Sequence, residues 1–598
     1  MSSKIETDIL IVGAGPSGAA LAAFLGQNGL SGLVIAKDAT TAQTPRAHGF
    51  NAFAFECLRD IGLEDEALRL AMRGPSFCSM RFSRNLVGEE YGRIAAWEED
   101  PIVSGLRKSL TPCEFVDLTQ RHTEPLILRA ATHSGFNVRF SYEMLDIKSF
   151  TDDQNKKSYI FQVLDHLTNH TVEIKTKYLF GADGGRSQVA RTFDFEFDSK
   201  RGGPKAVNIL IETDLSPYLN EERYSGLHWM VQPDRKVFPG VVAHLRAVRP
   251  WNEWVVVAIA PPGTNPFENL TPDHPEIIEL VRELVGDKSL AAKVVKVGHW
   301  SVRESVAKTY SSGPQLHLIG DAAHRHPPAL GLGANTCIQD SYNLAWKVAF
   351  VERGLAGPRL LETYTVERQP VGESLVRESN NQLRVNLDVQ SLLGMSATSP
   401  EEGLKSLHEL SQPTPEGGAR RDKLMELLEL KRVELESLGI AYNQWYTSEA
   451  VYLEDEPALR PQLEGNPVTE VQISTYPGSR LPHAWIDTPN RQKRISTHDL
   501  AGKGAFCLLI GGGGGNWRVA AEKIHETTNI PINVYSIGHG QQFNDFYRDW
   551  YKRRGVGDAG CVLVRPDRFV AWRSVDVAEN CERKLGEVLD KILLRHEL

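Results

Sequence analysis

The sequence predicts an α/β protein built from several domains, and three observations predict this class. Its 598 residues exceed what a single hydrophobic core usually serves. The N-terminal segment reads as a strand, a glycine-rich turn, a helix and a second strand, the order of a Rossmann-like βαβ unit. Segments over 191–300 alternate polar and apolar residues, and strands mixed with helices return after residue 470. We therefore expect a Rossmann-like domain, an antiparallel sheet and a separate C-terminal α/β domain.

Composition and charge exclude several classes of partner. The chain is 41% hydrophobic and 24% charged, and its net charge of −9 comes without a long basic run, so we expect no nucleic-acid partner. The apolar segment 9–30 contains five glycines and a proline, which argues against a membrane helix. The polar start lacks the layout of a signal peptide, and the seven cysteines have no CxxC spacing. These features predict free thiols and a cytoplasmic protein.

The first element is a strand at Asp8–Val12, followed by a helix over Pro16–Asn28 and a strand at Leu33–Ala36. The turn between strand and helix is GAGPSG, the GxGxxG pattern that binds a dinucleotide. Its first glycine permits the tight turn, its second lets a pyrophosphate approach, and its third lets the helix pack on the strand. A carboxylate for the ribose should end the second strand, where Ala36 stands; Asp38, two residues later, is its substitute.

A second motif, GDAAHRHPPALGLGAN at 320–335, follows a strand predicted at Gln315–Asp321 and precedes a helix that begins near Asn335. One interpretation is a metal site made of Asp321, His324 and His326, since two imidazoles and a carboxylate form a known ligand set. The other is a loop that passes close to a flat ligand ring, because glycine gives the necessary clearance. Histidines two positions apart, followed by prolines and glycines, favour the flat ligand, and the helix start favours an anionic one.

Three segments together resemble the fingerprints of the single-component FAD-dependent aromatic hydroxylases. They are GAGPSG, YLFGADGGRSQVAR (178–191) and LIGDAAHRHPPALGLGANTCIQDSYNLAWK (318–347). The resemblance implies a Rossmann-like FAD-binding domain of the glutathione-reductase type, FAD as cofactor, and NAD(P)H and O2 as co-substrates. It implies no metal. The implied cofactor-binding residues are Gly13, Gly15, Pro16, Ser17, Gly18, Lys37, Asp38, Arg46, Gln120, Asp183, Gly184, Asp321, Pro327, Pro328, Gly331, Gly333, Ala334 and Asn335.

The segment between the second and third fingerprints is predicted to be the substrate domain. Its alternating stretches fit antiparallel strands with one buried face, a sheet that roofs the flavin ring and keeps water out. The resemblance implies hydroxylation of a phenol beside its hydroxyl through a flavin C4a-hydroperoxide. A base near that hydroxyl would help, and His48 is the first candidate, against the alternative of a hydrogen-bonded structural histidine. Tyr224, His228 and His244 are further catalytic candidates with the same structural alternative.

The C-terminal part is predicted to be a thioredoxin-like domain. Strands at Phe506–Ile510, Ile532–Ile537, Cys561–Arg565 and Phe569–Trp572, with helices from about Asn516, over Phe543–Lys552 and at the end, give the order βαβαββα. The segment GCVLVRPDRFVAWR (560–573) resembles the end of the phenol hydroxylase and 2,4-dichlorophenol hydroxylase branch. Because the domain lacks CxxC, we expect it to be structural or to stabilise a homodimer. The glycines of IGGGGGNW are read as a flexible turn, since the Lys-Ser/Thr of a phosphate loop is absent.

The expected division of the chain is FAD-binding domain over 1–190 and 301–385, substrate domain over 191–300, helical connection over 386–470 and thioredoxin-like domain over 471–598. Alternatives to phenol hydroxylation stay open on the same scaffold: decarboxylative hydroxylation of a hydroxybenzoate, or oxidation of a larger aromatic metabolite. A flavin dehydrogenase or binding scaffold that does not oxygenate is the alternative from another class. The identity of the phenol and the choice between NADH and NADPH have no readable code in the residues.

Overall fold

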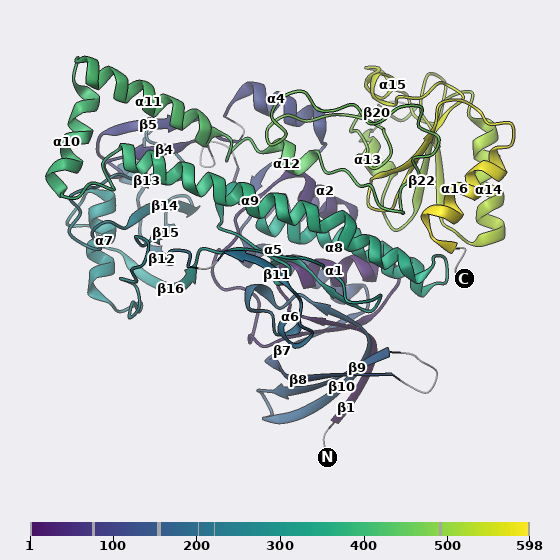
Figure 1. Ribbon diagram of the computed structural model, residues 1–598, viewed down its shortest axis with the longest axis horizontal. Helices are drawn as coiled ribbons and strands as arrows, with labels where there is room; N and C mark the ends of the chain where they lie inside the picture. The colour runs from purple at the N-terminus through teal and green to yellow at the C-terminus, as the bar shows by residue number, and fades with distance from the viewer. Residues whose placement is uncertain are drawn as a thin grey trace.

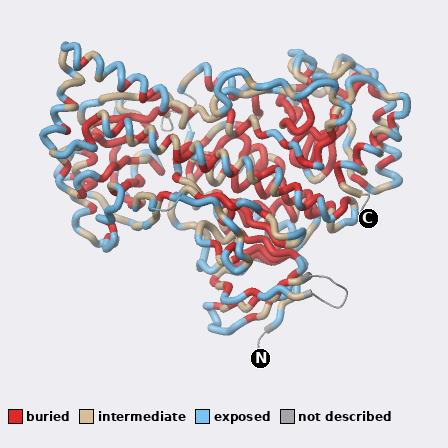
Figure 2. The backbone as a smooth tube through the Cα atoms, viewed as in Figure 1, coloured by how far each residue is buried: buried red, intermediate tan, exposed pale blue. Residues whose placement is uncertain are grey.

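The computed structural model describes residues 3–73, 78–97, 99–151, 157–200, 202–220, 222–489 and 493–595. Figure 1 shows two lobes at either end of the molecule, each built on a sheet, joined by a central body of helices above a third sheet. The buried residues concentrate inside the three sheets and in the helices between them (Figure 2). Among the described residues, no helix is long and apolar enough to cross a membrane.

The central sheet has the strand order β7-β2-β1-β10-β9-β8, with β18 also paired to β10. Strands β1, β2, β7, β10 and β18 run parallel, whereas β8 and β9 are antiparallel. The register places Val12 opposite Gly181, so the two fingerprint turns that follow these residues lie side by side. The bounds are β1 Ser3–Val12, β2 Gly32–Ala36, β7 Phe136–Phe140, β8 Tyr142–Thr151, β9 Lys157–Asp165, β10 His170–Gly181 and β18 Leu316–Leu318.

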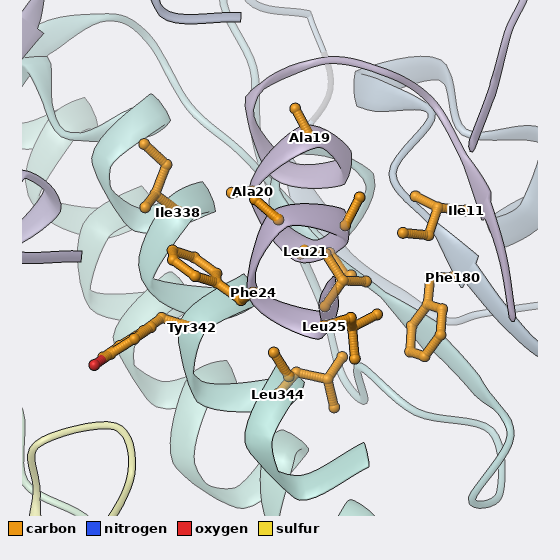
Figure 3. Close-up of a cluster of buried hydrophobic side chains, with 14 of the residues drawn as sticks. Ile11, Ala19, Ala20, Leu21, Phe24, Leu25, Phe180, Ile338, Tyr342 and Leu344 are labelled. Atoms are coloured by element: carbon orange, nitrogen blue, oxygen red, sulfur yellow. The ribbon is translucent and has the colours of Figure 1, made fainter. Parts of the chain in front are cut away.

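Helices α1 (Pro16–Gln27), α5 (Gln120–His133) and α8 (Gly333–Glu352) pack together beside this sheet. Figure 3 shows α1 between β1 and α8, with its apolar side chains turned to both. Phe24 contacts Tyr342 edge to face, with 5.0 Å between ring centroids. Helix α8 is buried along most of its length because the C-terminal lobe covers its far end.

The second sheet has the order β16-β12-β15-β14-β13-β4-β5 and includes the predicted substrate domain. Two of its strands come from far earlier in the chain, since β4 pairs parallel with β13 and antiparallel with β5. Helix α7 (Pro275–Val285) covers one face of the sheet. The strand bounds are β4 Met80–Ser83, β5 Glu90–Ile94, β12 Lys205–Glu212, β13 Leu227–Met230, β14 Val242–Arg249, β15 Glu253–Ile259 and β16 Lys293–Ser301.

A helical region follows, and its helix α9 (Thr363–Leu392) runs along most of the molecule in Figure 1. The expected boundary at residue 385 therefore falls inside a continuous helix. Helices α10 (Pro400–Ser411) and α11 (Pro415–Arg432) fold back onto the face of β13 and β4 that α7 leaves open. Helix α12 (Leu438–Tyr442) then leads toward the C-terminal lobe.

The C-terminal lobe has a four-stranded sheet of order β23-β22-β24-β25. The elements follow the order β22 Phe506–Ile510, α14 Gly515–Thr528, β23 Ile532–Ser536, α15 Asp549–Arg553, β24 Cys561–Val564, β25 Val570–Ser574 and α16 Cys581–Ile592. The helix predicted at Phe543–Lys552 is wrong over its first half. There Phe543 and Asn544 are held extended by backbone hydrogen bonds to Ser536 and Asp487, so tertiary pairing overrides the helical pattern.

Short elements complete the chain: β3 Gly49–Phe50, α2 Ala52–Asp60, α3 Glu64–Leu70, α4 Pro101–Leu110, β6 Val116–Asp117, η2 Gly184–Arg186, α6 Gln188–Thr192, β11 Phe197–Lys200, η3 Ser216–Tyr218, β17 Glu304–Ala307, η4 Gly320–Ala322, β19 His324–Arg325, η5 Ala329–Gly331, η6 Pro358–Glu362, β20 Trp485–Asp487, β21 Arg494–Ser496 and α13 Thr497–Leu500.

A fully buried ionic cluster joins the C-terminal lobe to the central body. Arg565, after β24, donates two hydrogen bonds to Glu367 of α9, at 2.6 and 2.8 Å, and two to Asp567, at 3.0 and 2.5 Å. Glu367 also accepts from Lys347 of α8 (2.7 Å), from Asn343 (2.7 Å) and from Ser448 (2.5 Å). Every charge in the cluster has a partner, so burial does not leave one isolated.

Candidate active site

A two-stranded ribbon places His48 beside Asp117. Strands β3 and β6 pair with Gly49 opposite Asp117, and the Leu118 N–H donates to the His48 carbonyl at 2.8 Å. The two side chains meet with 3.5 Å between His48 Nδ1 and Asp117 Oδ1. Both are buried, at 8% and 2% exposure. The short ribbon thus sets an imidazole against a carboxylate inside the protein.

The sheet above this pair supplies an arginine and a second histidine. Arg246 of β14 donates to Asp117 at 2.8 Å. His244, two residues earlier, lies on the same face of the strand, and its ring stands 4.3 Å from that of Trp229 on β13. Leu210, Val255 and Val257 form a buried apolar cluster in the same sheet. The predicted antiparallel sheet, called here the roof sheet, is therefore present, and it meets the His48–Asp117 pair through β14.

These contacts set the protonation states of the site. Burial lowers the pKa of His48, Arg246 lowers it further, and Asp117 offsets part of both effects. Burial alone would raise the pKa of Asp117, but Arg246 and His48 lower it below its usual range. Near neutral pH the geometry therefore gives a neutral imidazole beside a charged carboxylate, an arrangement that can accept a proton.

The structure does not bring all four catalytic candidates together. His228 is opposite Leu245 in the β13–β14 pairing, so it lies on the other face of the sheet from His244. Leu245 packs there against α7, and burial lowers the pKa of His228 to about 3. The ring of Tyr224 stacks on Trp251 at 5.2 Å, and Trp251 belongs to that same core. His48 and His244 thus lie on one side of the roof sheet, whereas His228 and Tyr224 contact residues of the core on the α7 side.

The GxGxxG turn lies where β1, β10 and α1 meet. Gly13 has φ +113°, and a Cβ on it would lie 2.1 Å from the Ala182 carbonyl oxygen, so only glycine fits. Gly15, in contrast, faces open space, because the atom nearest to a Cβ placed on it would be Glu124 Oε1, at 3.9 Å. Pro16 opens α1, Ser17 and Gly18 are buried in its first turn, and Lys37 and Asp38 lie exposed just after β2.

Further expected cofactor residues surround this turn. Gln120 and Arg46 belong to α5 and to the loop before β3, and the Ala47 N–H donates to Gln120 Oε1 at 3.4 Å. Gln120 also donates to Glu124 at 2.6 Å, and Glu124 accepts from the Ala42 N–H at 2.6 Å. Glu124 thus ties the loop of Arg46 to α5, a role that reasoning from the sequence missed. Its position one helical turn after Gln120 is the signal that could have found it.

The acidic residues of the second and third fingerprints also lie near the turn. Asp183 Oδ2 accepts from the N–H groups of Gln188 and Val189, while its buried Oδ1 has no hydrogen-bond partner among the described residues. Gly184 follows with φ +74°. Asp321 is exposed in η4, and the Ser17 side chain packs against Gly320 beside it.

The loop after Asp321 leads into α8, where Asn335 ties it to the His48 ribbon. Asn335 Nδ2 donates to the carbonyls of Gly49 (2.9 Å) and Gly331 (2.7 Å), and its Oδ1 accepts from the Asn51 N–H (2.8 Å). Pro327 is buried, whereas Pro328 and Gly331 are exposed and Gly333 and Ala334 are half-buried. Through Asn335 the loop and the His48 ribbon are held at a fixed separation.

The metal interpretation of this loop is not supported by the contacts. His324 Nε2 bonds Asp340 at 2.9 Å, and Asp340 also accepts from Arg368 at 2.7 Å. His326 Nδ1 bonds the Pro327 carbonyl at 2.7 Å. Within the described ranges, no group of three His, Cys, Asp or Glu side chains is placed to hold a metal ion.

Comparison with known proteins assigns the family. A model described as an FAD binding domain matches residues 6–379, and one described as the C-terminal part of aromatic-ring hydroxylases matches residues 474–595. The chain belongs to the FAD-dependent aromatic-ring hydroxylases. This confirms the resemblance found in the sequence, and with it FAD as the cofactor and an enzyme that hydroxylates aromatic rings.

Similar proteins span the full length of this hydroxylase. It is 34% identical to 2,4-dichlorophenol 6-monooxygenase of Delftia acidovorans over 601 residues, covering 100% of this chain and 99% of that protein. It is 36% identical to phenol 2-monooxygenase of a Pseudomonas species, with 98% of this chain and 93% of that protein covered. The solved structure of the flavin-dependent monooxygenase PieE with FAD and substrate has a TM-score of 0.91, 33% identity and full coverage of both chains.

The residues present fit FAD. The open space at Gly15 leaves room for a pyrophosphate close to the backbone, and the unpartnered Asp183 Oδ1 is a free acceptor for a cofactor hydroxyl within the described part of the chain. The exposed carboxylate of Asp321 is a second acceptor. All three lie at the carboxyl ends of β1, β10 and β18, which is where doubly wound sheets bind ligands.

Proposed function

We propose that this hydroxylase inserts oxygen into a phenol at the carbon beside its hydroxyl, with reduced nicotinamide nucleotide and O2 as co-substrates. The observation that carries the proposal is the buried pair of His48 and Asp117, bound by the half-buried Arg246 of the roof sheet. A phenolic proton needs an acceptor of this kind, because the phenolate ring is far more electron-rich than the phenol. The two phenol monooxygenases among the relatives support the same substrate class.

FAD, when bound, supplies the redox chemistry with O2 and the nicotinamide nucleotide. The residues that would hold it are those of the GxGxxG turn, together with Arg46, Gln120, Asp183, Asp321 and the loop from Pro327 to Asn335. Asn335 would set the distance between this loop and His48 through its hydrogen bonds to Gly49 and Gly331.

His48 would take the phenolic proton at Nε2, since its Nδ1 faces Asp117. The charged Asp117 orients the ring and stabilises the imidazolium that forms. Arg246 keeps Asp117 charged and favours a negative phenolate nearby. The apolar roof residues would keep water from the reacting ring.

The decarboxylative alternative is not favoured. A hydroxybenzoate would need a cation for its carboxylate. On the roof face Arg246 is already bound to Asp117, and Arg121 makes a two-pronged ion pair with Glu253 at 2.7 and 2.6 Å. A neutral phenol has no such requirement.

We infer that the C-terminal lobe is thioredoxin-like, because its strand order and its element order follow the βαβαββα pattern. We expect no redox exchange from it, because it lacks a CxxC motif and its cysteines Cys507, Cys561 and Cys581 are free and buried. The proposed domain division follows the expected boundaries, except that β4 and β5 join the substrate sheet and α9 crosses residue 385. We also propose, from the sequence alone, that the protein forms a homodimer and works in a reducing, cytoplasmic compartment.

The test uses the purified FAD-loaded protein with phenol, chlorophenols and hydroxybenzoates. Oxidation of NADPH or NADH, catechol product, CO2 and hydrogen peroxide are measured together. A phenol that accelerates nucleotide oxidation and yields one catechol per nucleotide supports the proposal. Release of CO2, or peroxide as the sole product with every phenol, would contradict it.

A further inference from the structure

A chain of buried hydrogen bonds starts at the turn that carries Asp321. The Gly320 N–H donates to Asp340 Oδ2 of α8 at 3.3 Å. His324 Nε2 donates to the same oxygen at 2.9 Å, since a charged carboxylate can only accept. Gly320 has φ +61°, and a Cβ on it would lie 2.1 Å from Ser17 Oγ, so its backbone has no room to move toward α1. The Asp340 carboxylate therefore holds both ends of the turn.

Arg368 of α9 binds the other oxygen of Asp340. Its Nε donates to Asp340 Oδ1 at 2.7 Å, and both side chains are fully buried. No other arginine or lysine pairs with Asp340 in the described part of the chain. Burial would raise the pKa of Asp340, but Arg368 and His324 hold it below its usual range. Arg368 thus keeps the carboxylate charged, which is the form that accepts the strongest hydrogen bonds from the turn.

The C-terminal lobe fixes Arg368 from the opposite side. Arg368 Nη1 donates to Gln444 Oε1 at 2.6 Å and to the Tyr446 hydroxyl at 3.0 Å. The Tyr446 ring stacks on Phe569, with 4.0 Å between the ring centroids and 21° between the planes. The Tyr446 N–H also donates to the Gly478 carbonyl at 2.9 Å. Because Phe569 and Gly478 belong to the C-terminal lobe, the position of Arg368 depends on that lobe.

This chain and the ionic cluster around Arg565 end at different places. Glu367 joins that cluster, which stops at the side chains of α8 and α9, whereas its neighbour Arg368 leads on to the Gly320 backbone. Every link of the chain is buried, where low dielectric strengthens a hydrogen bond and a lost partner leaves a polar group unsatisfied. A shift of Tyr446 would therefore reach the turn through two side chains.

We propose that Arg368 and Tyr446 are positioning residues, through which the C-terminal lobe holds the Asp321 turn in place for FAD. The inference rests on the part of the proposed function that assigns Asp321 to the cofactor. It gives the lobe a role in the reaction beyond stability, because hydroxylation needs the cofactor and the substrate ring in a fixed geometry. Loss of one link should loosen FAD and divert more of the O2 to hydrogen peroxide.

Tyr446→Phe tests the chain with the least disturbance, because the new ring can still stack on Phe569 while the bond to Arg368 is lost. Tyr476→Phe is the matched control. The Tyr476 hydroxyl donates to the Ala458 carbonyl at 3.0 Å, the same length, and this tyrosine is also buried. Arg368→Gln removes the cation from the chain, and Arg368→Lys retains it.

Four quantities are measured on each purified holoenzyme: FAD released on dilution, the midpoint potential of the flavin, peroxide formed per nucleotide oxidised, and the urea midpoint. Both tyrosine variants should lower the urea midpoint, since each loses one buried hydrogen bond. Tyr446→Phe alone should weaken FAD binding, by about threefold to tenfold, shift the midpoint potential and raise the peroxide yield. Arg368→Gln should weaken FAD binding more, and Arg368→Lys should recover part of that loss because it keeps a cation beside Asp340.

Combining the two changes tests whether they act through one chain of contacts. The double variant Tyr446→Phe/Arg368→Gln should release FAD no faster than Arg368→Gln. Losses that add up in the double variant, or FAD binding in Tyr446→Phe equal to that in Tyr476→Phe, would overturn the inference. If Arg368→Gln does not fold, Tyr446→Phe and its control still decide.

A further variant separates this inference from the proposed function. Asp321→Asn should weaken FAD binding at least as much as Tyr446→Phe does, and retention of FAD as in wild type would overturn the route through the Asp321 turn. FAD release is measured without any phenol, so it does not depend on the substrate. If no phenol is hydroxylated while Tyr446→Phe still loses FAD, the proposed function fails and the role of the chain stands.

Discussion

Replacing Arg565 with methionine tests the buried cluster that joins the C-terminal lobe to α8 and α9. The change removes four charge-assisted hydrogen bonds, two to Glu367 and two to Asp567. Glu367 keeps Lys347, Asn343 and Ser448, but Asp567 keeps only Asn343, at 3.0 Å, among its side-chain partners in the described ranges. One carboxylate is thus left buried without a cation.

The expected loss in the free energy of unfolding follows from these broken hydrogen bonds and from the stranded carboxylate. Each hydrogen bond to a charged group contributes about 1.5–3 kcal/mol. Breaking a buried ion pair by removing one partner costs about 3–5 kcal/mol, because the remaining charge stays buried. Lys347 still neutralises Glu367 at 2.7 Å, so the loss should stay near 3–5 kcal/mol and not reach the sum of four bonds.

Urea unfolding of the holoenzyme, followed by tryptophan fluorescence and by FAD release, measures this loss. Arg583→Met is the control, because the exposed Arg583 of α16 faces Glu587 at 3.8 Å in water, and it should change little. Adding Asp567→Asn to Arg565→Met should recover part of the stability, since it removes the buried charge that has lost its cation. A loss below about 1 kcal/mol, or a double variant that loses the sum of both changes, would refute the reasoning.

Four further changes test the site. His48→Asn should lower the hydroxylation rate about 10²- to 10⁴-fold. Because the pKa of His48 lies below 6.5, the wild-type rate should hold at neutral pH and fall in acid, below pH 6.5, where the imidazole becomes protonated. The pH–rate profile of the variant should lose this acidic fall. His228→Leu should leave kcat within about twofold in steady-state assays, because His228 faces α7. Gly13→Ala should abolish FAD retention, measured by absorbance, since its Cβ would overlap Ala182. Asn335→Ala should cost about 1–3 kcal/mol in urea unfolding and lower kcat, because it frees the His48 ribbon. Unchanged kcat in His48→Asn would remove the proton-acceptor role.

The parts of the fold that depend on residues adjacent along the chain could be predicted from the sequence. The GxGxxG unit is local, since the strand, turn and helix of 8–28 each carry their own signal, and the structure has β1 and α1 there. The helix expected over Phe543–Lys552 failed because its first half is held by Asp487 and Ser536, contacts that a helical pattern does not contain.

The active site was predictable only in part for the same reason. His48 was proposed from the sequence, but its neighbours Asp117 and Arg246 were not, because a two-residue ribbon and a roof strand bring them to His48 across 69 and 198 positions. His228 and His244 both stand in alternating strands and look equivalent in the sequence. Only the pairing of β13 with β14, and the face that α7 covers, shows that they point in opposite directions.

The passage of β4 and β5 into the roof sheet has a consequence for protein engineering and for synthesis on the ribosome. Met80 of β4 pairs with Leu227 of β13, so the roof closes only after the chain has travelled away and returned. A chimera that exchanges residues 205–301 alone would pair β13 of a relative with the native β4. The register between these two strands would then be mismatched. Domain shuffling among relatives should therefore move 80–94 and 205–301 together as one unit that is discontinuous in the gene.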